Sequence, residues 1–238
     1  MLPLKDDVPS LRPPVVTVAL VVLNTLVFLY QLSLDIGGST GGVAHGGTAA
    51  AEAFVYEFGA VPCRLTRACA ADFPNPLVTV LTSMFLHGGP LHVAGNMLYL
   101  WIFGDNVEDT LGHGRFLVFY LASGVTAATA QTMVAPQSRV PMIGASGAVS
   151  GVLAAYLILF PYARVLTLIT FGFFWRFVYL PAVLVLGFWI VVQLMSGFLT
   201  LSIGQGETGG VAWFAHIGGF VGGLVLLFVL RPRQSRRL

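Results

Sequence analysis

The sequence predicts an all-α membrane protein, a bundle of six transmembrane helices, from its composition and from the length of its apolar segments. Of the 238 residues, 56% are hydrophobic and only 9% are charged, and the mean hydropathy is +0.85. A water-soluble domain carries roughly a quarter charged residues, so this chain cannot cover a surface that faces water. The net charge of +2 and the low charge content also exclude disordered and nucleic-acid-binding chains.

Six apolar segments reach or approach the roughly 20 residues that a helix needs to cross a hydrocarbon core about 30 Å thick. They are residues 15–34, 91–103, 116–135, 143–160, 177–200 and 211–230. We expect the first to be a retained span and not a signal peptide, because Asp6 and Asp7 precede it and no small-residue cleavage site follows closely. Residues 77–86 are apolar but too short to span, so they are expected to lie in the interface or to enter the membrane partway.

The distribution of Lys and Arg predicts that both termini are cytoplasmic. An even number of spans puts both ends on one side, and the side with more Lys and Arg is the cytoplasm. With the N-terminus inside, only Arg64, Arg67 and Arg139 lie outside. The remaining nine of the 12 Lys and Arg residues lie inside: Lys5, Arg12, Arg115, Arg164, Arg176, Arg231, Arg233, Arg236 and Arg237.

This topology divides the chain into three parts. Residues 1–14 form a short cytoplasmic N-terminus, and residues 231–238 form a basic cytoplasmic tail. Residues 15–230 form the six-span domain, with a long external loop at residues 36–76 between the first two spans. A short glycine-rich loop at residues 202–210 is also expected outside.

Four polar side chains are expected at nearly the same depth in the membrane. Ser146 and His216 each lie about 21 Å from the inner end of their spans, and these spans run in the same direction. His92 lies within about a turn of that level, and Asn96 follows four residues later on the same helical face. The fourth span is too short to reach the outer surface, so water or protein must satisfy its first N–H groups. A recessed cavity that opens outward is the expected result.

Glycines at four-residue spacing predict close packing of the fourth and sixth spans. Gly147 and Gly151 are expected to meet the glycine pairs of the sixth span, because such pairs let helix backbones approach closely. This contact would bring Ser146 within hydrogen-bonding reach of His216. The pairs on the sixth span are Gly218 with Gly222 and Gly219 with Gly223.

The polar layer favours a serine–histidine dyad over metal chemistry. Residues 87–92 read His-Gly-Gly-Pro-Leu-His and lack the glutamate of a helical zinc-protease motif. No Asp or Glu is expected near the layer, so no third acid completes a triad. We assign no role to His45, His87 or His113, and a purely structural polar clamp is the alternative for a membrane-embedded histidine.

The serine and the last histidine lie in recognisable motifs. Residues 144–147 read Gly-Ala-Ser-Gly, and residues 215–223 read Ala-His-Ile-Gly-Gly-Phe-Val-Gly-Gly. These resemble the Gly-x-Ser-x and Ala-His-x-x-Gly-x-x-x-Gly motifs of the rhomboid family of intramembrane serine proteases. His92 and Asn96 resemble the family's His-x-x-x-Asn on the second span. Together the motifs are specific, whereas each one alone is weak.

The likeness extends over most of the chain, at residues 77–230, where the order, the spacing and the six-span plan agree. Gly104, Glu108 and Gly112 resemble a structural motif that follows the second span in the family. Ser150 is a departure, because many members have an aromatic residue there that packs on the catalytic histidine.

A second departure concerns the first external loop. Family members often carry a Trp-Arg pair there, but this loop has no tryptophan. The Trp-Arg pair of this chain is Trp175-Arg176, which is expected on the opposite side of the membrane.

The resemblance implies a serine endopeptidase that cleaves single-span membrane proteins near the outer ends of their transmembrane segments. Ser146 would be the nucleophile, His216 the base, and His92 and Asn96 oxyanion donors. No metal or other cofactor and no nucleic acid is expected, and the partners are the substrates, the lipid bilayer and a weak homo-oligomer. The expected location is a bacterial plasma (inner) membrane.

Two other functions stay open at this stage. One is a non-catalytic rhomboid-like protein that binds membrane clients, although such relatives typically lose the serine or the histidine. The other is a small transporter, which the absence of visible inverted repeats makes a weaker hypothesis.

The two cysteines, Cys63 and Cys69, lie in one seven-residue stretch of the long external loop. An oxidising compartment would allow a disulfide, provided that the chain between them is not a regular helix. The alternative is two free thiols, and the sequence leaves both open.

Overall fold

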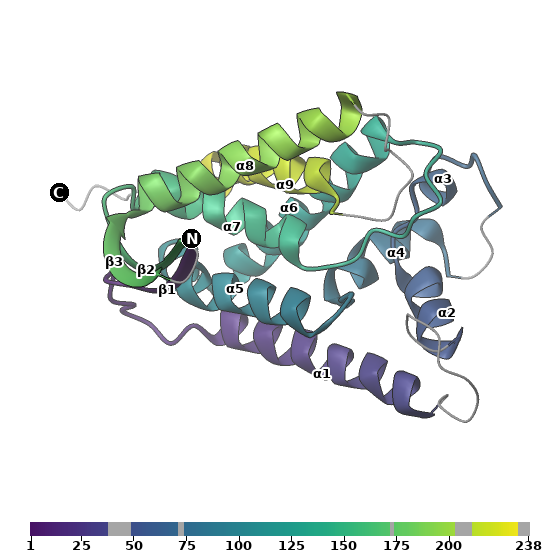
Figure 1. Ribbon diagram of the computed structural model, residues 1–238, viewed down its shortest axis with the longest axis horizontal. Helices are drawn as coiled ribbons and strands as arrows, with labels where there is room; N and C mark the ends of the chain where they lie inside the picture. Colours follow the sequence, from purple (N-terminus) through teal and green to yellow (C-terminus); the bar gives the residue numbers. More distant parts are fainter. Residues whose placement is uncertain (38–48, 71–73, 172–173, 203–210, 233–238) are drawn as a thin grey trace.

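Helices make up most of the computed structural model, and a small sheet lies at one end of the bundle (Figure 1). The structure describes residues 1–37, 49–70, 74–171, 174–202 and 211–232. The helices are α1 (Val15–Gly37), α2 (Ala49–Phe58), α3 (Pro62–Leu65), α4 (Pro76–Thr82), the 3₁₀ helix η1 (Ser83–Phe85), α5 (Pro90–Leu111), α6 (His113–Val134), α7 (Ser146–Leu159), α8 (Ala182–Ser202) and α9 (Trp213–Leu230). The strands are β1 (Leu2–Asp6), β2 (Arg164–Phe171) and β3 (Phe174–Pro181).

Within the described residues, four helices are long and apolar enough to cross a membrane: α1, α6, α8 and α9. A fifth candidate is the pair formed by Pro76–Phe85 and α5, which bends by 83° at its break. The apolar segment at residues 77–86 is thus a separate short helical piece set at a steep angle to α5. Six spans remain a prediction, because α7 is an apolar helix of only 14 residues.

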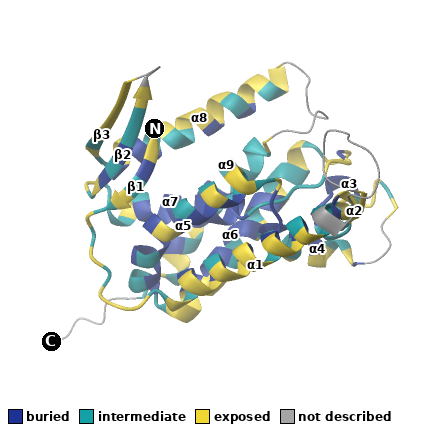
Figure 2. Cartoon of the chain, turned by 60° about the horizontal axis from the view of Figure 1, so that its bottom comes forward, coloured by how far each residue is buried: buried dark blue, intermediate teal, exposed yellow. Residues whose placement is uncertain are grey.

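Helix α7 lies at the centre of the bundle, and Figure 2 shows it largely buried. Its residues from Gly147 to Tyr156 are all buried. At 1.5 Å per residue, 14 residues extend over about 21 Å, which is less than the thickness of a hydrocarbon core. A helix this short is stable inside a membrane protein because its neighbours, and not lipid, surround it.

Two glycine contacts join α7 to α9. A Cβ atom built on Gly219 would lie 2.0 Å from the carbonyl oxygen of Gly147, and one built on Gly223 would lie 2.4 Å from the Cα of Gly151. Side chains at these positions would therefore force the two backbones apart. The expected pairing of Gly218 and Gly222 with the fourth span is wrong. Their missing side chains face α6, where a Cβ would collide with Ala130 and Thr126 respectively.

The all-α expectation is wrong at the end of the bundle that carries the sheet. The fifth span was expected to begin at residue 177, but residues 174–181 form β3 and α8 begins at Ala182. Strand β3 pairs antiparallel with β2, and β2 pairs antiparallel with β1. Aromatic and β-branched residues favour a strand once a partner strand is available. For β3 that partner is β2, whose other edge pairs with β1 from the N-terminus.

The motif Gly104-x-x-x-Glu108-x-x-x-Gly112 attaches α1 to α5. The buried Glu108 carboxylate accepts hydrogen bonds from the backbone N–H groups of Val16 and Thr17, at 2.8 and 2.7 Å, and therefore caps the start of α1. The lack of a side chain at Gly104 leaves room for Thr17. Gly112, with φ +81°, makes the turn between α5 and α6 in a conformation that favours glycine.

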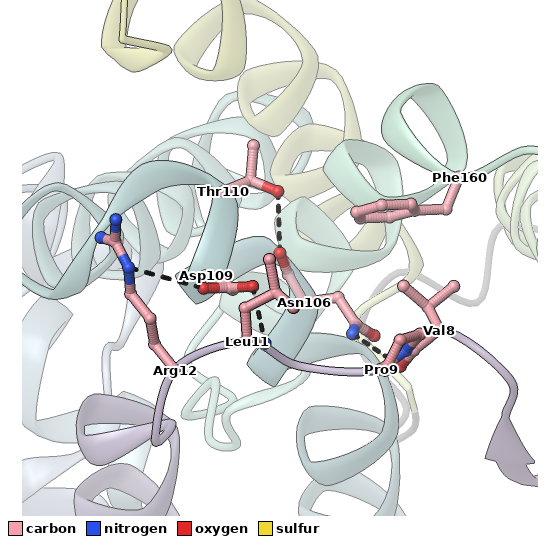
Figure 3. A pocket seen from close by; sticks show the side chains of 8 residues that line it. All are labelled: Val8, Pro9, Leu11, Arg12, Asn106, Asp109, Thr110 and Phe160. Atoms are coloured by element: carbon pink, nitrogen blue, oxygen red, sulfur yellow. Dashed lines mark hydrogen bonds and ion pairs between the residues drawn. The ribbon is translucent and has the colours of Figure 1, made fainter.

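The segment before α1 also lies against α5 (Figure 3). Asn106 donates a hydrogen bond to the carbonyl oxygen of Val8, and the Leu11 N–H donates to Asp109 at 3.0 Å. These residues line a cavity of about 450 Å³, to which none of the predicted site residues contributes. Both described ends of the chain, β1 and the end of α9, lie at the end of the bundle that carries the sheet (Figure 1).

Cys63 and Cys69 form a disulfide, with their Cα atoms 5.3 Å apart. The helix that contains Cys63, α3, ends at Leu65, so the chain turns back before it reaches the second cysteine. The N–H groups of Ala68 and Cys69 both donate to the carbonyl oxygen of Cys63, at 2.8 and 3.1 Å. The disulfide therefore closes a compact turn, and the chain between the two cysteines is not a regular helix, as such a bond requires.

We predict that Gly219→Val destabilises the protein by at least about 2 kcal/mol, because the new side chain must separate α9 from α7. Thermal unfolding in detergent measures the loss. The control is Gly187→Val on α8, where nothing lies within 4 Å of an added Cβ. Equal melting temperatures for the two variants would show that the α7–α9 glycine contact does not support the fold.

We also predict that the contribution of Asp6 to the stability falls as the pH rises from about 4 to about 6. Burial, with a smaller contribution from the charges of Asp105 and Asp7, raises the pKa of Asp6 from 3.8 to about 6, although its hydrogen bond from Tyr156 opposes this. The folded protein therefore holds this proton more tightly than the unfolded chain, and the stabilisation is lost as the proton leaves.

Asp6→Asn should remove this part of the pH dependence and raise the melting temperature at pH 7.5. The control is Asp7→Asn at the exposed neighbouring position, which should keep most of the dependence, because the charge of Asp7 makes only a small contribution to the pKa of Asp6. A lower melting temperature of Asp6→Asn at pH 7.5 would contradict the assignment. Melting curves at pH 4.5 and 7.5 give the comparison.

Candidate functional site

Ser146 is the first residue of α7, and the segment before it is fixed at two points. Met142 and Ala60 exchange backbone hydrogen bonds of 2.8 and 3.1 Å, and the Gly144 N–H donates to the carbonyl oxygen of Ser83 at 2.9 Å. Gly144 has φ +118°, a conformation that favours glycine. Because the first N–H groups of a helix have no partner within it, the start of α7 presents free donors beside the serine hydroxyl.

His216 lies in the first turn of α9, within hydrogen-bonding distance of this serine. Its Nε2 is 2.8 Å from Ser146 Oγ, and its Nδ1 is 2.7 Å from Gln193 Oε1 on α8. The expectation that Ser146 and His216 lie at one depth agrees with this distance. The glycine contacts between α7 and α9 lie farther along the same two helices and hold them close together.

Two tryptophans flank the imidazole ring. The Trp189 ring, on α8, lies 5.9 Å from the His216 ring with an interplanar angle of 35°, and the Trp213 ring meets it edge-on at 6.2 Å. Ser150, at the position where many rhomboid proteins have an aromatic residue, is buried and donates its hydroxyl hydrogen bond to the carbonyl oxygen of Ser146. The aromatic neighbours of His216 therefore come from α8 and α9 instead of α7.

His92 and Asn96 lie near the serine on α5. A Cβ built on Gly144 would lie 2.7 Å from His92 Nε2 and 3.6 Å from Ser146 Oγ, so this histidine and the serine flank one backbone position. His92 Nδ1 accepts a 3.3 Å hydrogen bond from the Gly88 N–H, which leaves Nε2 to face Gly144. Asn96 is buried, and its Nδ2 has no hydrogen-bond partner among the described residues.

All four polar side chains line one cavity of about 1140 Å³. Helices α5, α7, α8 and α9 contribute its walls, and Tyr99 and Trp189 are among its lining residues. The cavity is the site at which a reacting group could contact the serine, the histidine and the unpaired amide of Asn96 together. Among the described residues, no cluster of three His, Cys, Asp or Glu side chains is arranged to hold a metal ion.

The other two histidines that the structure describes do not join this arrangement. His87 is buried, its ring lies 5.1 Å from that of His92, and its backbone exchanges hydrogen bonds with Gln31. His113 pairs with Glu108 near the start of α6. His45, the acid Glu207 and most of the glycine-rich loop at residues 202–210 lie outside the described residues.

Three residues around His216 were missed by sequence reasoning: Gln193, Trp189 and Gln131. Gln131, on α6, accepts a 3.2 Å hydrogen bond from the Ala215 N–H and so fixes the first turn of α9. A signal for the other two was present, because a polar residue in a membrane span needs a polar partner. Trp189 and Gln193 are four residues apart and therefore share a face of the fifth span.

In chemical terms, the site pairs a hydroxyl with an imidazole that can take its proton. Such a pair activates serine as a nucleophile when a carbonyl carbon lies within reach. Free N–H donors at the start of α7 and the side chains of His92 and Asn96 lie around the same space, where they could stabilise negative charge on an oxygen.

Comparison with known proteins places this site within a matched domain. Residues 74–233 match the family described as the Rhomboid domain. The chain is 36% identical over 144 residues to rhomboid protease GluP of Bacillus subtilis, which covers 60% of this chain and 24% of that protein. It is 32% identical over 99 residues to the mitochondrial rhomboid protein 1 of Saccharomyces cerevisiae, covering 40% of this chain and 29% of that protein.

A third relative is the chloroplastic rhomboid-like protein 11 of Arabidopsis thaliana, with 31% identity over 162 residues, or 65% of this chain and 53% of that protein. The chain therefore spans between about a quarter and about half of the length of these relatives. These relatives are a protein of a bacterium, a mitochondrial protein and a chloroplastic protein. The matched domain and the long apolar helices indicate an integral membrane protein.

Proposed function

Because the chain belongs to the rhomboid family, we propose that it is an intramembrane serine endopeptidase whose nucleophile is Ser146 and whose general base is His216. The observation that carries this proposal is the 2.8 Å distance between Ser146 Oγ and His216 Nε2 at the wall of a large cavity. The name of the related rhomboid protease GluP supports the same class of activity.

In the first half of the reaction, Ser146 Oγ attacks the carbonyl carbon of the scissile peptide bond while His216 Nε2 takes the hydroxyl proton. The tetrahedral intermediate carries its negative charge on the former carbonyl oxygen. His216 then gives the proton to the leaving amine, and an acyl-enzyme ester on Ser146 remains. Water, deprotonated by His216, hydrolyses that ester and releases the second product.

The oxyanion is stabilised by the Ser146 N–H together with His92 and Asn96. The buried Asn96 Nδ2, which has no partner in the described part of the chain, supports this role because a free buried donor gains a hydrogen bond when the oxyanion forms. His92 is held by its hydrogen bond from Gly88, so its Nε2 faces the position beside the serine.

The proposed substrates are single-span membrane proteins, cleaved near the outer ends of their transmembrane segments. A peptide bond within a helix is shielded by its hydrogen-bonded backbone, so the segment must unwind before attack, and water must reach the site through a cavity. The cavity beside Ser146 supports such access. Helix α8 forms one side of it and is the proposed lateral entry.

The topology belongs to the same proposal. Residues 15–230 form six spans with the external loop at residues 36–76, and the cytoplasm holds residues 1–14 and the basic tail at residues 231–238. The position of β1 and the end of α9 at one end of the bundle supports an even number of spans (Figure 1). A bacterial plasma membrane is the proposed location, and we propose that copies of the protein associate weakly with one another.

We expect Ser146→Ala and His216→Ala each to abolish cleavage of single-span substrates by the purified protein. Ser146→Ala should also lose labelling by a serine-reactive fluorophosphonate. The matched control is Ser150→Ala, one turn along the same helix, which removes only a hydroxyl that bonds to a backbone carbonyl. Cleavage retained by Ser146→Ala would overturn the assignment, and a wild-type protein that binds but never cleaves these substrates would be a non-catalytic relative.

His92→Ala and Asn96→Ala should each lower kcat by about tenfold to about a hundredfold, because the remaining donors still hold the oxyanion. Steady-state kinetics in detergent measures the effect. Asn24→Ala is the control, since Asn24 is a buried asparagine on α1 whose amide bonds to the carbonyl oxygen of Leu20. Wild-type kcat in both test variants would exclude these two residues from the oxyanion site.

A further inference from the structure

Helix α8 turns a single buried amide toward the proposed base. Five residues of α8 are buried, and four of them are apolar or glycine: Ala182, Val185, Leu186 and Gly197. The fifth is Gln193, which is only 5% exposed. Burial of an amide in apolar surroundings is costly unless its oxygen and its nitrogen find partners. The hydrogen-bond partners of the Gln193 amide therefore indicate its role.

Each end of this amide has one partner. The Nε2 donates to the carbonyl oxygen of Trp189, one turn earlier on α8, at 3.3 Å, and the Oε1 lies 2.7 Å from His216 Nδ1. The opposite orientation would place the amide oxygen against the Trp189 carbonyl oxygen, two acceptors with no proton between them. The backbone of α8 thus determines that an acceptor faces His216.

An acceptor at this position selects one tautomer of the imidazole. His216 Nδ1 must carry a proton to donate to Gln193 Oε1, so in the neutral ring Nε2 is unprotonated. That nitrogen is the one 2.8 Å from Ser146 Oγ, where a general base needs a free lone pair. The other tautomer would direct an N–H at the serine and could not accept its proton.

We propose that Gln193 is the positioning residue that orients His216 and holds it in the tautomer that accepts the proton of Ser146. This inference rests on the proposed protease function. Trp189 has a supporting part, since its ring lies beside the imidazole while its carbonyl oxygen orients the amide of Gln193. One face of α8 therefore supplies both contacts, and the amide takes the place that a carboxylate has in a Ser-His-Asp triad.

The test replaces Gln193 with leucine, which has a similar size and no acceptor. We expect kcat to fall about tenfold with KM unchanged, since one hydrogen bond to the base is lost and substrate binding is not. In detergent micelles, the ¹⁵N signals of His216 should change from one protonated Nδ1 tautomer to a mixture. Gln193→Glu, with its carboxyl proton on the oxygen that faces the Trp189 carbonyl, keeps an acceptor at the same place and should return kcat to within about threefold of the wild type.

The matched control is Gln31→Leu, which removes another buried glutamine whose amide bonds to the backbone of His87. It should lower the melting temperature without changing the tautomer of His216. If Gln193→Leu loses stability but keeps the wild-type tautomer and kcat, the residue is only a clamp between α8 and α9, and the proposal is overturned. If that variant does not fold, Gln193→Met gives the same comparison.

The experiment also separates this inference from the proposed function. The tautomer is measured without substrate, so it reports the role of Gln193 even if no substrate is cleaved. Absence of both cleavage and fluorophosphonate labelling in the wild type would reject the protease function. A wild-type tautomer in Gln193→Leu, with normal labelling, would reject the positioning role alone.

Discussion

The backbone contact between α7 and α9 is the constraint on which the rest of the site depends. Gly219 meets Gly147 and Gly223 meets Gly151 so closely that no Cβ fits at either position of α9. In lipid, helices gain little from hiding apolar surface, so close packing of this kind supplies much of the attraction between them. The same closeness brings a serine at the start of one helix to a histidine in the first turn of the other.

The short length of α7 follows from its central position. A helix of 14 residues cannot cross a hydrocarbon core alone, and here its first N–H groups end beside a cavity instead of in lipid. Neighbouring helices bury its sides, and the loop before it is fixed to Ala60 and Ser83. Because α7 begins below the membrane surface, its first turn presents N–H donors and the Ser146 hydroxyl at the wall of the cavity.

The helices around this centre differ in how firmly they are attached. Glycine contacts bind α9 to both α6 and α7, whereas α8 is largely exposed (Figure 2). Yet α8 supplies Trp189 and Gln193, which contact His216. An outward displacement of α8 would withdraw both groups, so the geometry of the base depends on the most peripheral of the helices that surround the cavity.

Much of this protein was determined by the sequence alone. Composition indicated a membrane protein, and the motifs around Ser146 and His216 indicated the site, because both signals lie in contiguous residues. The expected depth of these residues followed from the fixed rise of a helix. The Gly147–Gly219 and Gly151–Gly223 contacts also followed, since four-residue spacing leaves a groove on one helix face whatever the partner is.

Only the tertiary structure decided the features that depend on distant partners. Residues 174–181 are apolar enough to read as part of a helix, and they form a strand because β2 is available to pair with them. Gly218 and Gly222 face α6 because a helix flanked by two neighbours can direct adjacent rows of glycine to different sides. Gln193 is 23 residues from His216 in the chain, and no local pattern states that its amide reaches the imidazole. Spacing within a helix gives the face on which a side chain lies, whereas the packing of the helices decides what that face meets.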